Sequence, residues 1–134
     1  GICLARGFVN SGLSELIGAG LADLTTMHPL ALIAVICLAV TFMTEATSNT
    51  ASTTLLMPIL AAAALAAGVA PELTMVPAAM SASCAFMLPV ATAPNTVVFS
   101  SGLVSTARMA REGLVLNLLG ALVISSFCYL YFGR

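Results

Sequence analysis

Residues 44–54 read TEATSNTASTT, and the interpretation of the whole chain depends on this stretch. Every side chain in it except those of Ala46 and Ala51 carries a hydroxyl, amide or carboxylate group. The segments on either side, ALIAVICLAVTFM (residues 31–43) and LLMPILAAAALAAG (residues 55–68), are almost purely apolar. A dense polar cluster between two such segments needs a reason, because unpaired polar groups are costly to place in apolar surroundings.

The composition is that of a membrane protein. Of 134 residues, 60% are hydrophobic and 7% are charged, whereas soluble domains carry roughly 25% charged residues. Four arginines, no lysine and five acidic residues are too few to cover the surface of a water-soluble domain of this size. We therefore predict an all-α integral membrane protein embedded in a lipid bilayer. The absence of basic runs argues against a nucleic-acid partner.

The apolar runs beside the polar cluster are short. Residues 29–43 and residues 55–67 each fall below the about 20 residues that a helix needs to cross a bilayer. Two short arms joined by a polar tip predict a re-entrant hairpin over residues 29–70, with the tip buried in protein or facing a water-filled cavity. One long span through the cluster, or two spans joined by a polar loop, are the alternatives.

A second interruption is predicted within residues 73–106. An apolar helix is expected from Leu73 to Val90, and Pro89 and Pro94 then flank residues 91–93. Proline lacks an N–H and clashes with the preceding turn, so this stretch should be unwound. The segment is predicted to be a discontinuous transmembrane helix.

The two ends of the chain complete the predicted order. Residues 1–28 show moderately amphipathic spacing, which predicts an interfacial arm helix and the end of a preceding segment. Residues 112–133 contain an apolar run long enough for the last transmembrane helix.

Two interrupted apolar segments in one chain are a sequence signal of a transporter binding site. Free N–H groups at the start of a half-helix favour an anion, and unwound carbonyl groups can bind a cation. The side chains that supply oxygens or donors at the two interruptions are Thr44, Thr47, Ser48, Asn49, Thr50, Thr92 and Asn95. Neither interruption contains arginine or lysine, so a bound anion would depend on a co-bound cation for neutralisation. The alternative for Ser-Asn-Thr is an ordinary helix cap.

Glu45 is the one acidic residue within the apolar body of the chain. Ionisable residues inside a membrane are candidates for function. A direct role in coupling is one hypothesis. The alternatives are that Glu45 faces an outer aqueous cavity or acts as a protonated hydrogen-bonding strut.

Two long motifs resemble those of one transporter family. TEATSNTASTTLLMPI (residues 44–59) and LPVATAPNTVVFSSG (residues 88–102) are similar to the second hairpin and second broken helix of the divalent anion/sodium symporters, the DASS or INDY-type carboxylate transporters. GFVNSGLSELIG (residues 7–18) and REGLVLNLLGALVISSFCY (residues 111–129) resemble the preceding arm and the last membrane helix. The resemblance covers nearly the whole chain.

The resemblance implies a fold and a set of site residues. The chain would be the C-terminal one of two inverted repeats. The substrate carboxylate would be contacted by Ser48, Asn49, Thr50 and Thr92. A sodium site would be formed by Thr44, Thr47, Asn49 and Ala91, partly through backbone carbonyl groups. The family commonly has a second proline where this chain has Ala93, so Pro94 alone would break the helix.

The resemblance also implies a function. The chain would be the C-terminal part of a sodium-coupled dicarboxylate transporter of the succinate, malate and fumarate class, with elevator-type alternating access. It would lie in the inner or plasma membrane, crossing it several times, beside the N-terminal repeat of the same transporter and within a homodimer. Na⁺ would be the coupling ion, and no cofactor is expected. Alternatives are a symporter of sulfate or another divalent anion, a dicarboxylate exchanger, or a non-functional membrane fragment. An enzyme is disfavoured, because the single histidine lies far from the polar tip.

Overall fold

The computed structural model describes Gly12, residues 28–66 and residues 68–133. The predicted arm over residues 1–28 lies outside the described residues, apart from Gly12 and His28. The described helices are α3 (Pro29–Ala46), α4 (Asn49–Ala66), α5 (Glu72–Ser81), α6 (Ala93–Ser100) and α7 (Thr106–Phe132). Helices are the only regular secondary structure in this part of the chain.

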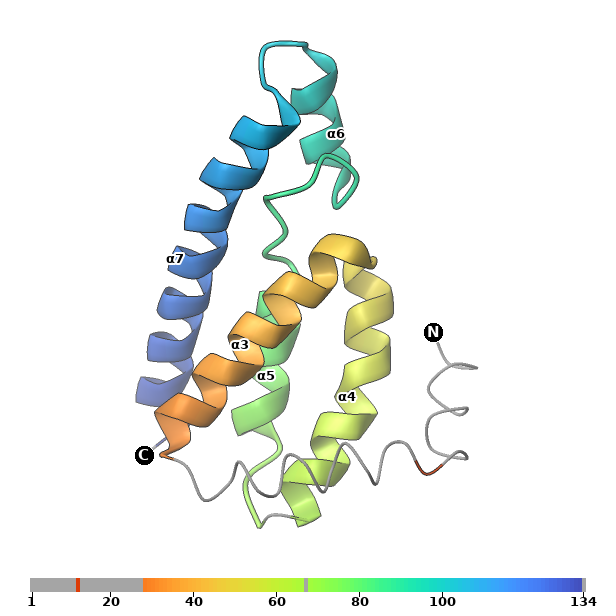
Figure 1. The fold of residues 1–134 in the computed structure, drawn as a ribbon. Helices are drawn as coiled ribbons and strands as arrows, with labels where there is room; N and C mark the ends of the chain where they lie inside the picture. Colours follow the sequence, from red (N-terminus) through yellow and green to blue (C-terminus); the bar gives the residue numbers. More distant parts are fainter. Residues whose placement is uncertain (1–11, 13–27, 67, 134) are drawn as a thin grey trace.

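Helix α3 contacts α4, α5 and α7 and is the central helix of the described structure. It and α4 form the two arms of a V, α5 lies beside both arms, and α7 packs along α3 (Figure 1). Helix α6 lies beyond the point of the V, near the start of α7 (Figure 1). The segment between α5 and α6 therefore passes the junction of α3 and α4.

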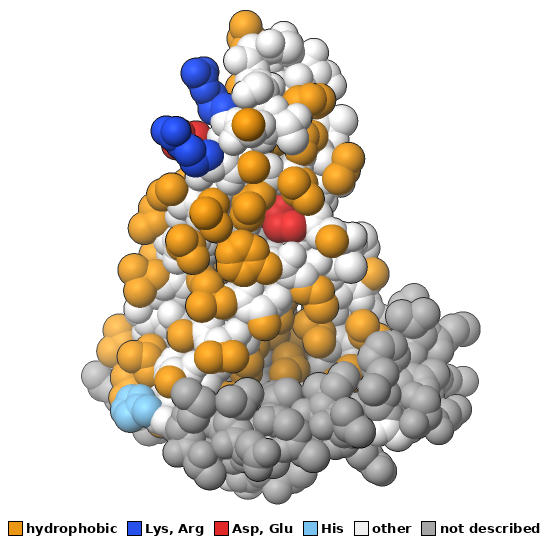
Figure 2. Space-filling view, viewed as in Figure 1, with side chains coloured by type: hydrophobic (Ala, Val, Ile, Leu, Met, Phe, Trp, Pro, Cys, Tyr) orange, Lys and Arg blue, Asp and Glu red, His pale blue; other side chains and the backbone are white. Residues whose placement is uncertain are grey.

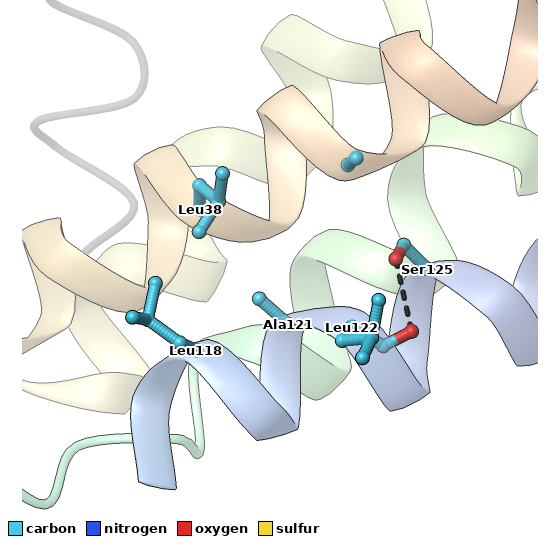
Figure 3. Close-up of a pocket in the computed structure, with 6 residues that line it drawn as sticks. Leu38, Leu118, Ala121, Leu122 and Ser125 are labelled. Carbon is cyan, nitrogen blue, oxygen red and sulfur yellow. Dashed lines mark hydrogen bonds between the residues drawn. The ribbon is translucent and has the colours of Figure 1, made fainter. Parts of the chain in front are cut away.

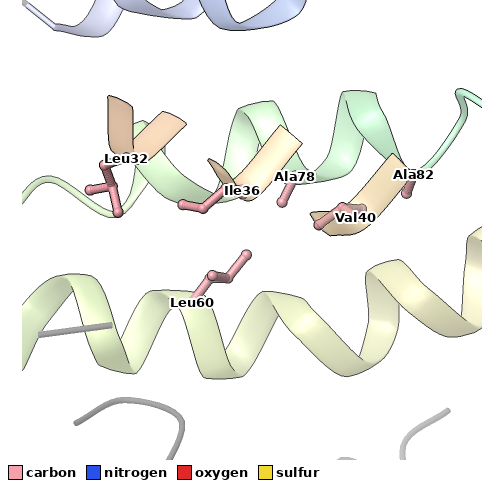
Figure 4. Packing of buried hydrophobic residues seen from close by; sticks show 6 residues of the cluster. All are labelled: Leu32, Ile36, Val40, Leu60, Ala78 and Ala82. Atoms are coloured by element: carbon pink, nitrogen blue, oxygen red, sulfur yellow. The ribbon is translucent and has the colours of Figure 1, made fainter. Parts of the chain in front are cut away.

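Two apolar clusters join these helices on two sides of α3. Leu32, Ile36 and Val40, each four residues apart, line one face of α3. They pack with Leu60, Ala78 and Ala82, from α4, α5 and the segment after α5 (Figure 4). A second cluster joins α3 with α5 and α7 and consists of Ile33, Cys37, Leu73, Ala121, Ile124 and Cys128. Residues 32–40 of α3 thus pack against every described helix except α6.

The length and apolar character of two described helices support the prediction of a membrane protein. Helices α3 and α7 are both long and apolar enough to cross a bilayer. Much of the outward surface of α7 is apolar, including Leu116, Leu119, Leu122 and Val123. Apolar side chains also dominate the face shown in Figure 2. The all-helical membrane architecture is confirmed at this level, whereas the re-entrant hairpin and the inverted repeat stay predictions.

The helix boundaries differ from the predicted ones at three places. The polar cluster is mostly helical, because α3 continues to Ala46 and α4 begins at Asn49. The helix expected from Leu73 to Val90 ends at Ser81, so the non-helical segment covers residues 82–92. The last helix begins at Thr106, where Ser105 caps it by accepting the N–H of Arg108 at 3.3 Å. The prediction of a helix beyond Ser81 was wrong, because the N–H groups of Ser83 and Cys84 bond three residues back, to Met80 and Ser81, and do not continue the helical pattern.

Candidate sodium and substrate site

The turn between α3 and α4 is closed by its own side chains. Thr47 Oγ1 lies 2.6 Å from Ser52 Oγ, and it also donates to the carbonyl oxygen of Met43. Ser48 Oγ accepts the N–H of Ala51 at 3.0 Å, which is the contact of a helix N-cap. The capping alternative for Ser48 is therefore realised. Asn49 and Thr50 occupy the first turn of α4, where helical N–H groups have no partner within the helix.

Three oxygen atoms meet where α3 approaches the second interruption. Thr44 Oγ1 lies 2.7 Å from Asn49 Oδ1 and 2.9 Å from the carbonyl oxygen of Ala82. The hydroxyl of Thr44 has one proton, so it donates to only one of these oxygens at a time. Thr44 is fully buried. The arrangement is rich in oxygen and poor in protons, which suits a hard cation.

The other end of the second interruption is organised around Asn95. Thr92 Oγ1 caps α6 by accepting the N–H of Asn95 at 3.4 Å. Asn95 Nδ2 donates to the carbonyl oxygens of Ala85 and Leu88, at 2.8 and 3.0 Å. The sequence suggested that Asn95 supplies polar atoms to a bound ion or substrate. In the structure its amide nitrogen instead ties the non-helical segment to α6. Ala91 is half-buried, and its N–H donates to the carbonyl of Leu88.

Glu45 holds the same segment from the side of α3. Its side chain is only 6% exposed. Oε1 accepts the N–H of Met87 at 2.9 Å, and Oε2 accepts the N–H of Leu88 at 3.0 Å. These contacts agree with a hydrogen-bonding strut and not with a side chain that faces an aqueous cavity. Both carboxyl oxygens accept hydrogen bonds, so the contacts do not require the proton that the predicted strut carries. They also give partners to two N–H groups of the non-helical segment, which have no helical carbonyl to bond.

Asn117 of α7 completes the contact and was not predicted. Its Nδ2 donates to Glu45 Oε1 at 2.7 Å, and its Oδ1 accepts the N–H of Phe86 at 3.3 Å. Gly113, one turn earlier, lies so close that a Cβ atom there would overlap the backbone carbonyl group of Phe86. Asn117 could have been identified from the sequence as the one amide side chain in the apolar run GLVLNLLGALVI (residues 113–124).

The structure brings together some predicted site residues and not others. Thr44 and Asn49 are in direct contact, and Thr47 lies at the turn beside them. Among the described hydrogen bonds, the end of α3 reaches the second interruption at Ala82, Met87 and Leu88. None joins the tip to Ala91 or Thr92. The roles assigned to individual residues stay predictions.

A separate apolar pocket of about 210 Å³ lies between α3 and α7. Its lining consists of Ala34, Leu38, Leu118, Ala121, Leu122 and Ser125 (Figure 3). The Ser125 hydroxyl donates to the carbonyl of Leu122 at 3.1 Å, so it is already satisfied. This pocket offers no group for an ion and is not a candidate for the polar site.

Positive charge in the described residues lies away from the polar junction. Arg108 and Arg111 are exposed near the start of α7, where the blue side chains gather in Figure 2. Arg111 pairs with Glu112 at 3.6 Å on the surface. Within residues 28–66 and 68–133, the hydrogen bonds of Glu45 come only from N–H groups, and no cationic side chain pairs with it.

Comparison with known proteins places the chain in a transporter family. Residues 1–133 match the family model described as the sodium:sulfate symporter transmembrane region. The chain belongs to this family, which confirms the predicted resemblance. The description as a transmembrane region, with two helices able to span a bilayer, also confirms the predicted multi-pass membrane location.

Curated relatives are sodium-dependent dicarboxylate transporters and related solute carriers. The sodium-dependent dicarboxylate transporter SdcS of Staphylococcus saprophyticus is 46% identical over 129 residues, covering 96% of this chain and 25% of the relative. Solute carrier family 13 member 2 of Oryctolagus cuniculus is 49% identical over 124 residues, covering 92% of this chain and 21% of the relative. The chain thus spans about a quarter, or less, of the length of these relatives.

Proposed function

We propose that this chain is the C-terminal part of a sodium-coupled secondary transporter for dicarboxylates of the succinate, malate and fumarate class. The name of the relative SdcS, a sodium-dependent dicarboxylate transporter, supports the coupling ion and the substrate class. The observation that carries the proposal is the meeting of Thr44 Oγ1, Asn49 Oδ1 and the Ala82 carbonyl beside a non-helical segment. Neutral oxygens at such a break are the ligands that a desolvated Na⁺ takes in transporters.

The proposed sodium site uses Thr44, Thr47, Asn49 and Ala91. Thr44 and Asn49 would contribute side-chain oxygens. The hydroxyl of Thr47 already bonds within the turn, so Thr47 would contribute its carbonyl. Ala91 can contribute only backbone oxygen. The contact of Thr44 with Ala82 adds the Ala82 carbonyl as a further oxygen that the sequence did not indicate.

The proposed substrate site uses Ser48, Asn49, Thr50 and Thr92. These residues lie at the N-terminal ends of α4 and α6, where helix dipoles and free N–H groups favour a carboxylate. No arginine or lysine of the described residues lies at this junction. A dianion would therefore need Na⁺ nearby, which favours binding of Na⁺ first and of the substrate second.

In the complete transporter the chain would function with partners. The N-terminal repeat would supply the matching half of the site, and a homodimer in the inner or plasma membrane would provide the scaffold. The hairpin of α3 and α4 and the broken helix of α5 and α6 would then move together as an elevator-type transport domain. The contacts of Thr44 and Glu45 with residues 82–88 support such joint movement.

Uptake of labelled succinate tests the proposal. Cells that express a complete protein containing this chain are assayed with and without Na⁺, in competition with sulfate and with citrate. Succinate uptake that requires Na⁺ and ignores sulfate is expected. Uptake without Na⁺, or only into cells preloaded with succinate, would instead identify an exchanger.

A sulfate symporter is the second candidate, because the matched family description names sulfate. The same assay separates the two. Labelled sulfate uptake that requires Na⁺, with no succinate uptake, would replace the dicarboxylate by sulfate and leave the sodium site in place.

A further inference from the structure

We propose that Glu45 and Asn117 are positioning residues that set the affinity of the transport site for sodium. Together they would hold residues 86–88 so that the non-helical segment keeps its carbonyl groups in place beside Thr44 and Asn49. The inference rests on the proposed function and adds to it two residues that would not touch the ion or the substrate themselves.

The geometry is a closed set of hydrogen bonds among three parts of the chain. Glu45 of α3 binds the N–H groups of Met87 and Leu88. Asn117 of α7 binds both Glu45 and the N–H of Phe86. Three consecutive N–H groups of a non-helical segment are thus satisfied by two side chains. Asn117 is fully buried and Glu45 nearly so, so water cannot readily replace either acceptor.

The carboxylate is suited to this task because both of its oxygens accept. One oxygen takes two donors and the other takes one. Replacing Glu45 by glutamine would turn an NH₂ group toward an N–H group on one side, so one contact would be lost. Hydrogen bonds to a buried charged acceptor are stronger than those between neutral groups, so the segment is held firmly.

The bridge is directly connected to the proposed sodium site. Glu45 follows Thr44 on the last turn of α3, and the Thr44 hydroxyl lies 2.9 Å from the carbonyl of Ala82, the first residue of the segment. Asn95 fixes the carbonyls of Ala85 and Leu88 from the other side. A segment released at residues 86–88 would change where its carbonyl groups lie, and sodium affinity depends on those positions.

The test compares Glu45→Gln, Asn117→Leu and the double variant in the complete transporter. Glu72→Gln is the matched control, because Glu72 is exposed at the start of α5. Surface expression, the maximal uptake rate, the substrate KM at saturating Na⁺ and the Na⁺ concentration for half-maximal uptake are measured. Asn117→Leu removes no charge, so it separates positioning from electrostatic attraction of the cation.

Each single variant is expected to raise the half-saturating Na⁺ concentration about tenfold, with the substrate KM at saturating Na⁺ little changed. The double variant should be close to the larger single effect, because both side chains act on one segment. If the half-saturating Na⁺ concentration rose in Glu45→Gln and not in Asn117→Leu, the charge of Glu45 would attract sodium directly, and the positioning role would be wrong. Multiplied effects in the double variant, or lower expression with unchanged sodium dependence, would also overturn the proposal.

A second readout does not depend on transport. Spin labels are placed by Leu65→Cys on α4 and Val90→Cys in the segment, both exposed positions, after replacement of the native cysteines. The distance distribution should be narrow in the parent and broader in both Glu45→Gln and Asn117→Leu. Equal distance distributions in the parent and both variants would overturn the positioning role. This result does not depend on which substrate the transporter carries.

Discussion

The two interruptions of this chain are held in different ways. The first, between α3 and α4, consists of Thr47 and Ser48 and is closed by neighbouring side chains within the sequence TEATSNTAS (residues 44–52). The second, residues 82–92, depends on Glu45 and Asn117, which lie on other helices. A short break can thus be stabilised locally, whereas a long non-helical segment in apolar surroundings needs acceptors from elsewhere.

Prolines do not explain this difference. Pro58 lies inside α4 and Pro77 lies inside α5, and both helices continue through them. The second interruption begins at Ala82, well before Pro89, and Pro94 stands at the start of α6, where proline is favoured. Helical bonding is lost before either proline, because the N–H groups of Ser83 and Cys84 bond three residues back, to Met80 and Ser81. The contacts made by the N–H groups of residues 86–88 then hold the non-helical segment in place.

The largest effect is expected at the first interruption. Asn49→Ala removes the oxygen 2.7 Å from Thr44 Oγ1, at the residue proposed to serve both sodium and substrate. Sodium-dependent succinate uptake should fall to background while surface expression is retained. Thr54→Ala is the control, because the Thr54 hydroxyl bonds only to the Thr50 carbonyl one turn back. Near-normal uptake by Asn49→Ala would remove Asn49 from the site.

A large effect at the second interruption is expected from Gly113→Ala. The added Cβ atom would overlap the Phe86 carbonyl group and push the segment away from α7. The half-saturating Na⁺ concentration should rise about tenfold, as expected for loss of a buried charged hydrogen bond. The Cβ atom added by Gly120→Ala meets only the Cys84 side chain, with Sγ at 3.3 Å and Cβ at 3.8 Å, so this variant should have a much smaller effect. Equal sodium titrations for the two variants would show that close contact with α7 is unimportant.

A smaller effect is expected from Thr92→Ala. It removes the cap of α6 and a proposed substrate contact, so the succinate KM should rise about fivefold, in line with the roughly 1 kcal/mol that a cap contributes. Thr92→Ser keeps the capping oxygen and should stay close to the parent. A change in sodium dependence as large as that of Gly113→Ala would contradict the separation of sodium and substrate contacts.

The smallest effect is expected from Pro58→Ala. Pro58 is exposed and lies within a helix that continues around it, away from both interruptions. The succinate KM and the sodium dependence should both remain within about twofold of the parent. Loss of transport in this variant, with normal expression, would show that the proline of α4 has a part in the site.

The sequence predicted those features whose causes are local. The polar cluster, the membrane environment and the family motifs all lie in continuous stretches, and the family and membrane predictions are confirmed. The predicted last helix, residues 112–133, missed the start of α7 at Thr106, although Ser105 is a typical N-cap residue. The second break was predicted from its prolines, which gave its presence and missed its beginning.

The rest depended on contacts between distant residues. Met87 and Phe86 find their acceptors in Glu45 and Asn117, 42 and 31 residues away in the chain. The pattern of apolar and polar residues within residues 73–90 does not indicate that these N–H groups bond to side chains far away in the sequence. The strut was one of the alternatives for Glu45, but its partner on α7 could be identified only from the fold.

Equilibrium binding of labelled succinate to the purified complete transporter, titrated with Na⁺, tests the central claim most directly. The account predicts no binding without Na⁺, saturable binding when Na⁺ is added, and loss of that binding in Asn49→Ala. Succinate binding that is independent of Na⁺, or that survives Asn49→Ala unchanged, would contradict a shared sodium and substrate site at the junction of the two interruptions.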